Sequence, residues 1–76
     1  MDEKIFCNIM NHIRKITEKQ GDKPEDIAIQ ITLVNGATIP ALLSDYELQD
    51  GYIEIWTQND NYFYVPVKNI LAITVE

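Results

Sequence analysis

The pattern of apolar and polar residues divides the chain into one helical segment followed by a series of strands. In the first twenty residues apolar positions recur every three or four residues, which predicts one amphipathic helix over about residues 3–20. Asp2 is suited to cap the start of this helix, and Gly21 is suited to end it in a left-handed conformation. The apolar stripe consists of Ile5, Ile9, Ile13 and Ile16, flanked by Phe6 and Met10.

From residue 27 onward apolar and polar residues alternate, as is typical of strands buried on one face. The predicted strands cover about residues 27–33, 38–46, 52–57, 62–67 and 70–75. Asn35-Gly36 between the first two predicts a type I′ hairpin turn, which needs positive φ at both central residues. Pro40 lacks an amide hydrogen, so the second strand should lie at an edge, a bulge or a bend there. The short link before the last strand predicts a 3₁₀-like corner.

One helix followed by five short strands predicts a mainly β fold, a small, strongly bent, five-stranded antiparallel barrel in a single domain of residues 1–76. The second predicted strand is long enough to bend between two parts of such a barrel. A chain of 76 residues is near the size at which one hydrophobic core is only marginally sufficient. Self-association is therefore expected, because an oligomer buries additional surface.

Charge is distributed unevenly along the chain. The net charge is −6, yet residues 1–20 carry four cations against three acids, a net charge of +1. Residues 21–76 carry two cations against nine acids, a net charge of −7. Because Lys and Arg supply most of the affinity for nucleic acid, the strand region is a poor RNA surface. A contact with an anionic ligand would use the polar row of the helix, which is otherwise a solvated face: Asn8, His12, Lys15 and Lys19.

Four aromatic residues share one face of the third and fourth predicted strands. They are Tyr52, Trp56, Tyr62 and Tyr64. Alternation places them opposite the apolar set that is expected to face the core: Ile53, Ile55, Phe63 and Val65. Tyrosine and tryptophan are enriched at subunit interfaces, where this row could be buried. The alternatives are separate packing on the surface and stacking with nucleic-acid bases.

Residues that would carry catalysis or bind a metal are few. His12 and Cys7 are the only histidine and cysteine, so no metal-binding spacing and no intramolecular disulfide exist. The glycines are far apart and form no phosphate-binding loop. We therefore expect no enzyme activity, no metal and no cofactor. With no apolar run of about 18 residues and no signal peptide, a cytoplasmic protein without membrane contact is expected.

Three stretches of the sequence are similar to motifs of one known superfamily. They are Leu33-Val34-Asn35-Gly36, Tyr46-Glu47 and the run from Val65 to Ile73. On these stretches the chain resembles the Sm-like superfamily, which includes bacterial Hfq. The resemblance implies a helix on a bent five-stranded barrel, assembly into rings and, in many members, RNA binding.

The RNA-contact positions of the superfamily are largely changed in this chain. Pro66-Val67 stands where an Arg-Gly pair is usual in the second motif. Val67-Lys68 stands where the bacterial proteins have Lys-His, so only Lys68 remains. The polar residue that contacts uridine falls near Tyr52. The resemblance therefore implies the fold and the oligomer more strongly than RNA binding.

Three hypotheses for the function follow. The first is a non-enzymatic, oligomeric adaptor that acts through protein–protein contacts. The alternatives are Hfq-like RNA binding, and capture of a small nucleotide-like, anionic ligand between subunits by aromatic stacking and lysine. The candidate binding residues are Asn8, His12, Lys15, Lys19, Tyr52, Trp56, Tyr62, Tyr64 and Lys68.

Overall fold

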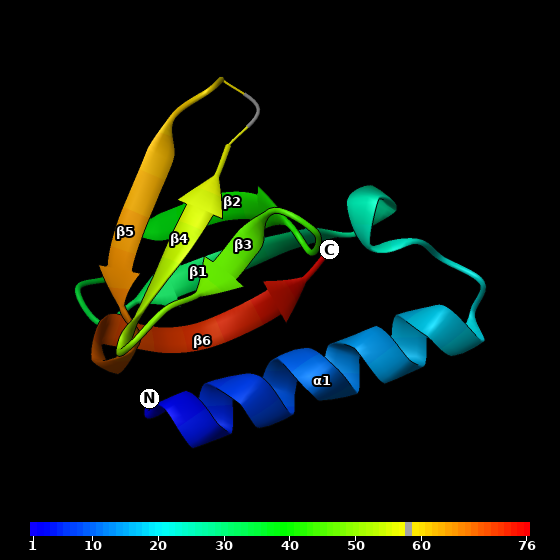
Figure 1. Ribbon diagram of the computed structural model, residues 1–76, viewed down its shortest axis with the longest axis horizontal. Coiled ribbons are helices and arrows are strands. Elements are labelled where there is room, and N and C mark those ends of the chain that lie inside the picture. The colour runs from blue at the N-terminus through cyan, green and yellow to red at the C-terminus, as the bar shows by residue number, and fades with distance from the viewer. Residues whose placement is uncertain (58) are drawn as a thin grey trace.

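The computed structural model describes residues 1–57 and 59–76, and across these residues it contains one α-helix and six strands in two antiparallel sheets (Figure 1). Helix α1 spans Glu3–Lys19. The strands are β1 (Ala28–Leu33), β2 (Thr38–Leu42), β3 (Tyr46–Leu48), β4 (Tyr52–Trp56), β5 (Tyr62–Pro66) and β6 (Ile70–Val75). Short 3₁₀ turns, η1 (Pro24–Asp26) and η2 (Val67–Asn69), precede β1 and β6. The predicted mainly β fold with an N-terminal helix is confirmed.

Helix α1 begins and ends where the sequence predicts. The Asp2 side chain accepts a hydrogen bond of 2.8 Å from the backbone N–H of Ile5, which satisfies one of the free donors of the first turn. Gly21 has a φ of +80°, the left-handed conformation that ends a helix and that glycine adopts without strain. The amino group of Met1 donates to the carbonyl oxygen of Ile70 at 2.7 Å, so the start of the helix lies beside β6.

The apolar stripe of α1 is turned relative to the prediction. The buried residues are Phe6, Met10, Ile13 and Thr17, while Ile5 and Ile16 are exposed. Successive helical residues are about 100° apart, so Ile5 and Ile16 lie just outside the arc that the sheets cover. Thr17 can be buried because its hydroxyl donates to the carbonyl oxygen of Ile13 at 3.0 Å. The prediction that Ile5 and Ile16 face the core is wrong.

The two sheets have the orders β2-β1-β6 and β3-β4-β5. In the first sheet Ile31 lies opposite Ile39 on one side and Ile73 on the other, so these residues share a face. In the second sheet Ile53 pairs with Leu48 and Val65 in the same way. These inner faces and α1 enclose the core, whose most deeply buried residues outside α1 are Ile29, Ile31, Leu43, Ile53, Ile55, Val67 and Ile70.

The predicted strand over residues 38–46 is split in two, which gives six strands where five were predicted. The backbone N–H of Leu43 still bonds to Ile27, beside the first sheet. Two residues later the carbonyl oxygen of Asp45 accepts from the backbone N–H of Trp56, beside the second sheet. The chain therefore passes from one sheet to the other at residues 43–45. Pro40 lies in β2, one of the two edge strands of its sheet, which fits its missing donor.

The two predicted turns have different outcomes. In the first hairpin only Gly36 has positive φ, and its N–H donates to the carbonyl oxygen of Leu33 at 2.9 Å. The type I′ prediction is wrong, because the loop is one residue longer and Asn35 instead accepts a hydrogen bond from the N–H of Ala37. The predicted 3₁₀ corner before the last strand is confirmed as η2.

Candidate functional site

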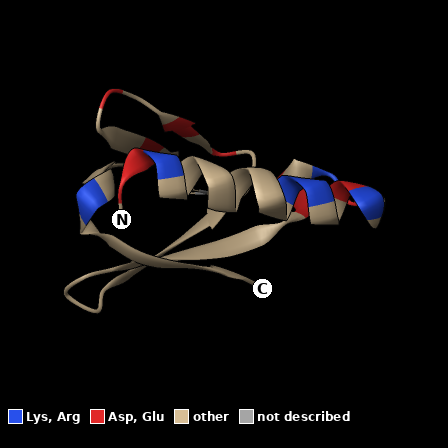
Figure 2. Cartoon of the chain, turned by 90° about the horizontal axis from the view of Figure 1, so that it is seen from below, with Lys and Arg blue, Asp and Glu red and all other residues tan. Residues whose placement is uncertain are grey.

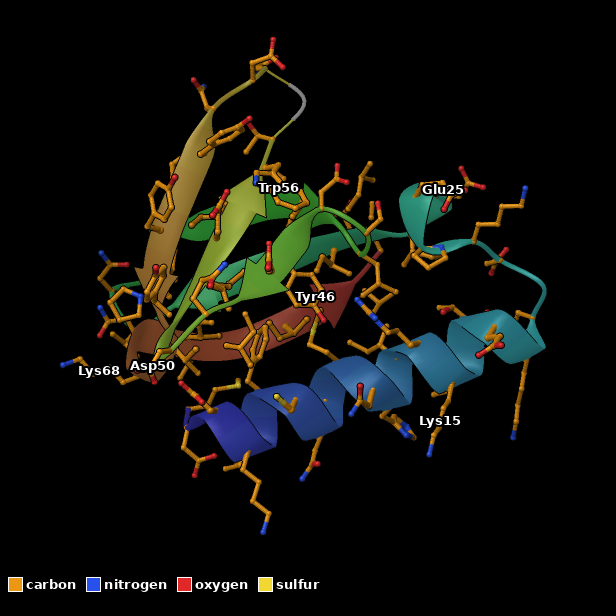
Figure 3. All side chains as sticks on the ribbon, viewed as in Figure 1. Lys15, Glu25, Tyr46, Asp50, Trp56 and Lys68 are labelled. Carbon is orange, nitrogen blue, oxygen red and sulfur yellow. The ribbon has the colours of Figure 1, made fainter. Side chains whose placement is uncertain are left out.

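The polar row of α1 lies on the side of the helix that faces away from the sheets. Asn8, His12, Lys15 and Lys19 are all exposed, and Figure 3 shows Lys15 pointing outward from the helix. Lys and Arg residues are concentrated on α1, with Lys23 and Lys68 in connections between elements (Figure 2). No helix in the described part of the chain is long and apolar enough to cross a membrane.

The aromatic row forms one outer face of β4 and β5, as the alternation predicts. The register pairs Trp56 with Tyr62, and Tyr64 with Glu54, so these side chains lie on the side of the sheet opposite Ile55. The rings of Tyr52 and Tyr64 have centroids 6.4 Å apart and are tilted by 57°. The three tyrosines are exposed. Trp56 is half-buried, and its indole N–H donates to the Glu54 carboxylate at 2.6 Å.

Carboxylates accompany the aromatic row on this face. Glu47 on β3 lies directly opposite Glu54 on β4, which places two acids on the outer side of the same sheet. Phosphate groups of a stacked oligonucleotide would be repelled by these charges. Lys15 does not compensate for these charges, since Lys15 and Trp56 lie on opposite sides of the molecule (Figure 3).

Lys68 belongs to a third place, at the corner between β5 and β6. It lies in η2, and the N–H of the preceding Val67 donates to the carbonyl oxygen of Gly51 at 3.0 Å. Lys68 therefore lies near the loop that contains Asp50 (Figure 3). The nine candidate residues fall into three separate sets: the helix row, the aromatic row and Lys68.

Exposed apolar residues lie on β5 and β6, each an edge strand of its sheet, which are here called the two outer strands. Tyr62, Phe63 and Tyr64 are consecutive and exposed on β5. Leu71 and Val75 are exposed on β6. Phe63 was expected to face the core, and it does share the inner face with Ile55, yet 42% of its surface is exposed. Alternation in the sequence identified the face on which Phe63 lies. It did not show that this face is partly uncovered at β5, the last strand of its sheet.

A small cavity lies between the two sheets, where β2 gives way to β3 and β4 ends. Its volume is about 240 Å³. The apolar part of its lining includes Ile29, Ala41 and Leu42, and the polar part includes Asp45, Trp56 and Glu76. Sequence reasoning selected only Trp56 of this set. The others are brought together by the bend at residues 43–45 and by the end of β6.

Tyr46 connects α1 to β3 on the covered side of the molecule. The ring of Phe6 packs edge-on against it, with centroids 5.8 Å apart. The Arg14 guanidinium lies 5.4 Å from the centre of the Tyr46 ring and donates to its hydroxyl at 3.3 Å. Burial raises the pKa of the Tyr46 phenol above its usual value, and the Arg14 charge opposes part of that rise.

Neither the described side chains nor known proteins point to a reaction. Among residues 1–57 and 59–76, no group of three or more His, Cys, Asp or Glu side chains could hold a metal ion. Cys7 is a free, half-buried thiol. Comparisons with protein-family models, with curated proteins and with solved structures found no match. The candidate functional features are therefore the two outer strands, the aromatic row and the cavity beside Trp56.

Proposed function

We propose that this chain is a non-enzymatic, oligomeric binding protein of Sm-like architecture that acts through protein–protein contacts. The observation that carries the proposal is the run of exposed aromatic residues on β5, a strand that pairs only with β4 in the described sheet. An uncovered outer strand offers free backbone donors and acceptors to another chain. Aromatic residues on such a strand are typical of surfaces that become buried on association.

The second outer strand supplies a complementary surface. β6 pairs only with β1 in the described sheet, and 61% of the surface of Leu71 is exposed. β5 and β6 have five and six residues, so their lengths match for pairing. They lie at different sides of the molecule (Figure 1). Pairing of β5 in one copy with β6 in the next is a head-to-tail contact, which forms a ring if its rotation closes.

The bend between the sheets supports the Sm-like part of the proposal. Residues 38–48 belong first to the sheet β2-β1-β6 and then to the sheet β3-β4-β5. The two sheets can therefore be followed as one strongly bent antiparallel system with β6 and β5 at its ends. Contact between β5 of one copy and β6 of the next would leave neither strand with an unpaired edge. A subunit of a ring of barrel-like domains has its two end strands paired in this way.

The experiment measures the oligomeric state by light scattering after size exclusion and by native mass spectrometry. We expect the native chain to be an oligomer and Leu71→Lys to shift it toward smaller species, because a charge at the contact would have to be desolvated. Val34→Lys is the matched control. Val34 is 59% exposed, close to the 61% of Leu71, but it lies in the first hairpin loop rather than on an outer strand.

A native chain that stays monomeric at micromolar concentration would contradict the proposal, and so would an equal loss of association in both lysine variants. Far-ultraviolet circular dichroism establishes that each variant is folded.

Titration with uridine-rich and adenine-rich oligonucleotides tests the alternative of RNA binding. Tight binding at about 150 mM salt, where exposed charges are screened over about 8 Å, would replace the adaptor function by RNA binding.

A further inference from the structure

The cavity beside Trp56 combines an apolar interior with an acidic rim. Ile29, Ala41 and Leu42 contribute apolar residues to its lining, and Trp56 lines it at the end of β4. Asp45 and Glu76 are the charged residues of its described lining, which contains no Lys, Arg or His. A ligand that fits this lining has an aliphatic or planar body and a positive charge.

Backbone hydrogen bonds hold both acids at the cavity. The N–H of Trp56 donates to the carbonyl oxygen of Asp45 at 2.9 Å, which fixes the position of the bend relative to the end of β4. The N–H of Glu76 donates to the carbonyl oxygen of Ala28 at 3.0 Å, which places Glu76 beside the start of β1. One Asp45 carboxylate oxygen accepts from the Ser44 hydroxyl at 2.9 Å, which restricts rotation of the carboxylate. The two acids of the rim therefore lie next to strand ends, Asp45 directly before β3 and Glu76 directly after β6.

The indole ring is oriented as well. Its N–H donates to the Glu54 carboxylate at 2.6 Å, from the residue two positions earlier on the outer face of β4. This bond brings a third carboxylate to the edge of the ring and restricts its rotation. A cation over a tryptophan face is attracted by the negative π surface, and the nearby carboxylates add to that attraction.

We propose that this cavity binds an arginine side chain of a partner protein, with the guanidinium stacked on Trp56 and paired with Asp45 and Glu76. A guanidinium is planar, stacks on aromatic rings and offers a fork of donors to carboxylates, which matches this lining better than a lysine ammonium. The cavity of about 240 Å³ lies below the usual range for drug-sized ligands, about 300–1,000 Å³, so it suits a single side chain.

The acidic charge of the chain also favours a basic partner. Residues 21–76 carry a net charge of −7, and the face next to the cavity presents Glu47 and Glu54 beside exposed tyrosines. A basic segment that places one arginine in the cavity would lie along this face. The inference rests on the proposed function for a protein as partner, but it does not require the β5–β6 contact.

The experiment follows the fluorescence of Trp56, the only tryptophan in the chain. The 76-residue chain is titrated with a short capped peptide Gly-Arg-Gly and with the same peptide containing citrulline, which is neutral and nearly the same shape. We expect a saturable fluorescence change with the arginine peptide and binding weaker by about tenfold or more with citrulline, because hydrogen bonds to charged groups are the stronger ones. Equal binding of both peptides, or no saturation by the arginine peptide, would overturn the inference.

Substitutions of the acidic residues test whether the arginine peptide binds at the cavity. We expect Glu76→Gln and Asp45→Asn each to weaken binding of the arginine peptide several-fold, while Asp50→Asn, an exposed acid at the opposite end of β4, leaves it unchanged. Glu76 is exposed, so its variant tests the cavity even if Asp45→Asn disturbs the bend. Unchanged affinity in Glu76→Gln and in folded Asp45→Asn would also overturn the inference.

The titration is repeated with Leu71→Lys, whose oligomeric state is altered under the proposed function. Retained arginine binding in a smaller species supports the cavity independently of self-association. A monomeric native chain that binds the arginine peptide would contradict the oligomer and leave the cavity supported. A native oligomer that fails to bind the arginine peptide would contradict the cavity proposal and leave self-association supported. The two proposals can therefore fail separately.

Discussion

Ile55 and Phe63 lie directly opposite each other on the inner face of the same sheet, yet only Ile55 is covered. Ile55 is fully buried, whereas Phe63 is 42% exposed. The other sheet repeats this difference, because Ile29 on β1 is buried and its partner Val75 on β6 is 44% exposed. In both sheets the inner face is apolar to its last strand, but the opposite sheet and α1 leave Phe63 on β5 and Val75 on β6 partly uncovered. Apolar residues on the outer strands are thus available for another chain.

The largest expected effect on the free energy of unfolding is at Ile55, the covered residue of the pair. Ile55→Ala should lower the free energy of unfolding by roughly 2–5 kcal/mol, because it leaves a cavity in a closed core. Phe63→Ala should lower it by only about 1 kcal/mol in dilute protein, since part of the ring is already in water and solvent can fill the space. Urea denaturation of the two variants measures the difference.

Protein concentration sharpens the same experiment. If Phe63 is buried between copies, its substitution should cost more as concentration rises, because association stabilises the folded chain by mass action. The cost of Ile55→Ala in the subunit core should change less. Equal costs for both substitutions at all concentrations would show that the two positions are equivalent, contrary to their difference in exposure.

An intermediate effect tests the helix that covers the core. Asp2→Ala should lower the free energy of unfolding by about 1 kcal/mol, because the N–H of Ile5 loses its 2.8 Å side-chain acceptor at the start of α1. Asp22→Ala is the matched control, an exposed acid beyond the other end of the same helix. Thermal unfolding followed by circular dichroism measures both variants. A loss in Asp22→Ala as large as in Asp2→Ala would mean that general charge effects, and not the cap, account for it.

Local signals in the sequence were sufficient for the helix and most strands. Asp2 and Gly21 marked the ends of α1 because capping and left-handed geometry depend on single residues. Alternation placed Tyr52 and Trp56 on one face of β4 because side-chain direction in a strand has a period of two. The chemistry of these elements is local, so no knowledge of the tertiary structure was needed.

The remaining features depend on what covers each element. Ile5 and Phe63 satisfy the apolar periodicity, but their exposure follows from the limited width of the opposing layer. The hairpin loop at Asn35 is fixed by the pairing of Leu33 with Ala37, which local preference for a type I′ turn does not determine. The cavity joins residues from 28 to 76 in the chain, so no spacing motif could reveal it.

The smallest expected effect concerns pH and the contact between α1 and β3. Because burial raises the pKa of Tyr46 in the folded protein, the folded chain holds a proton that the unfolded chain releases at lower pH. The resulting stabilisation is complete below the unfolded pKa of 10.0 and is lost as pH rises through the folded value. Tyr46→Phe should therefore lose less stability than the native chain when pH is raised above 10.0, while Tyr62→Phe, at an exposed position on β5, should follow the native curve. Urea denaturation at a series of alkaline pH values measures the three slopes. Coincident slopes for the native chain and Tyr46→Phe would show that the phenol is as accessible to water in the folded protein as in the unfolded one. The region of β3 that α1 covers would then not include the Tyr46 hydroxyl.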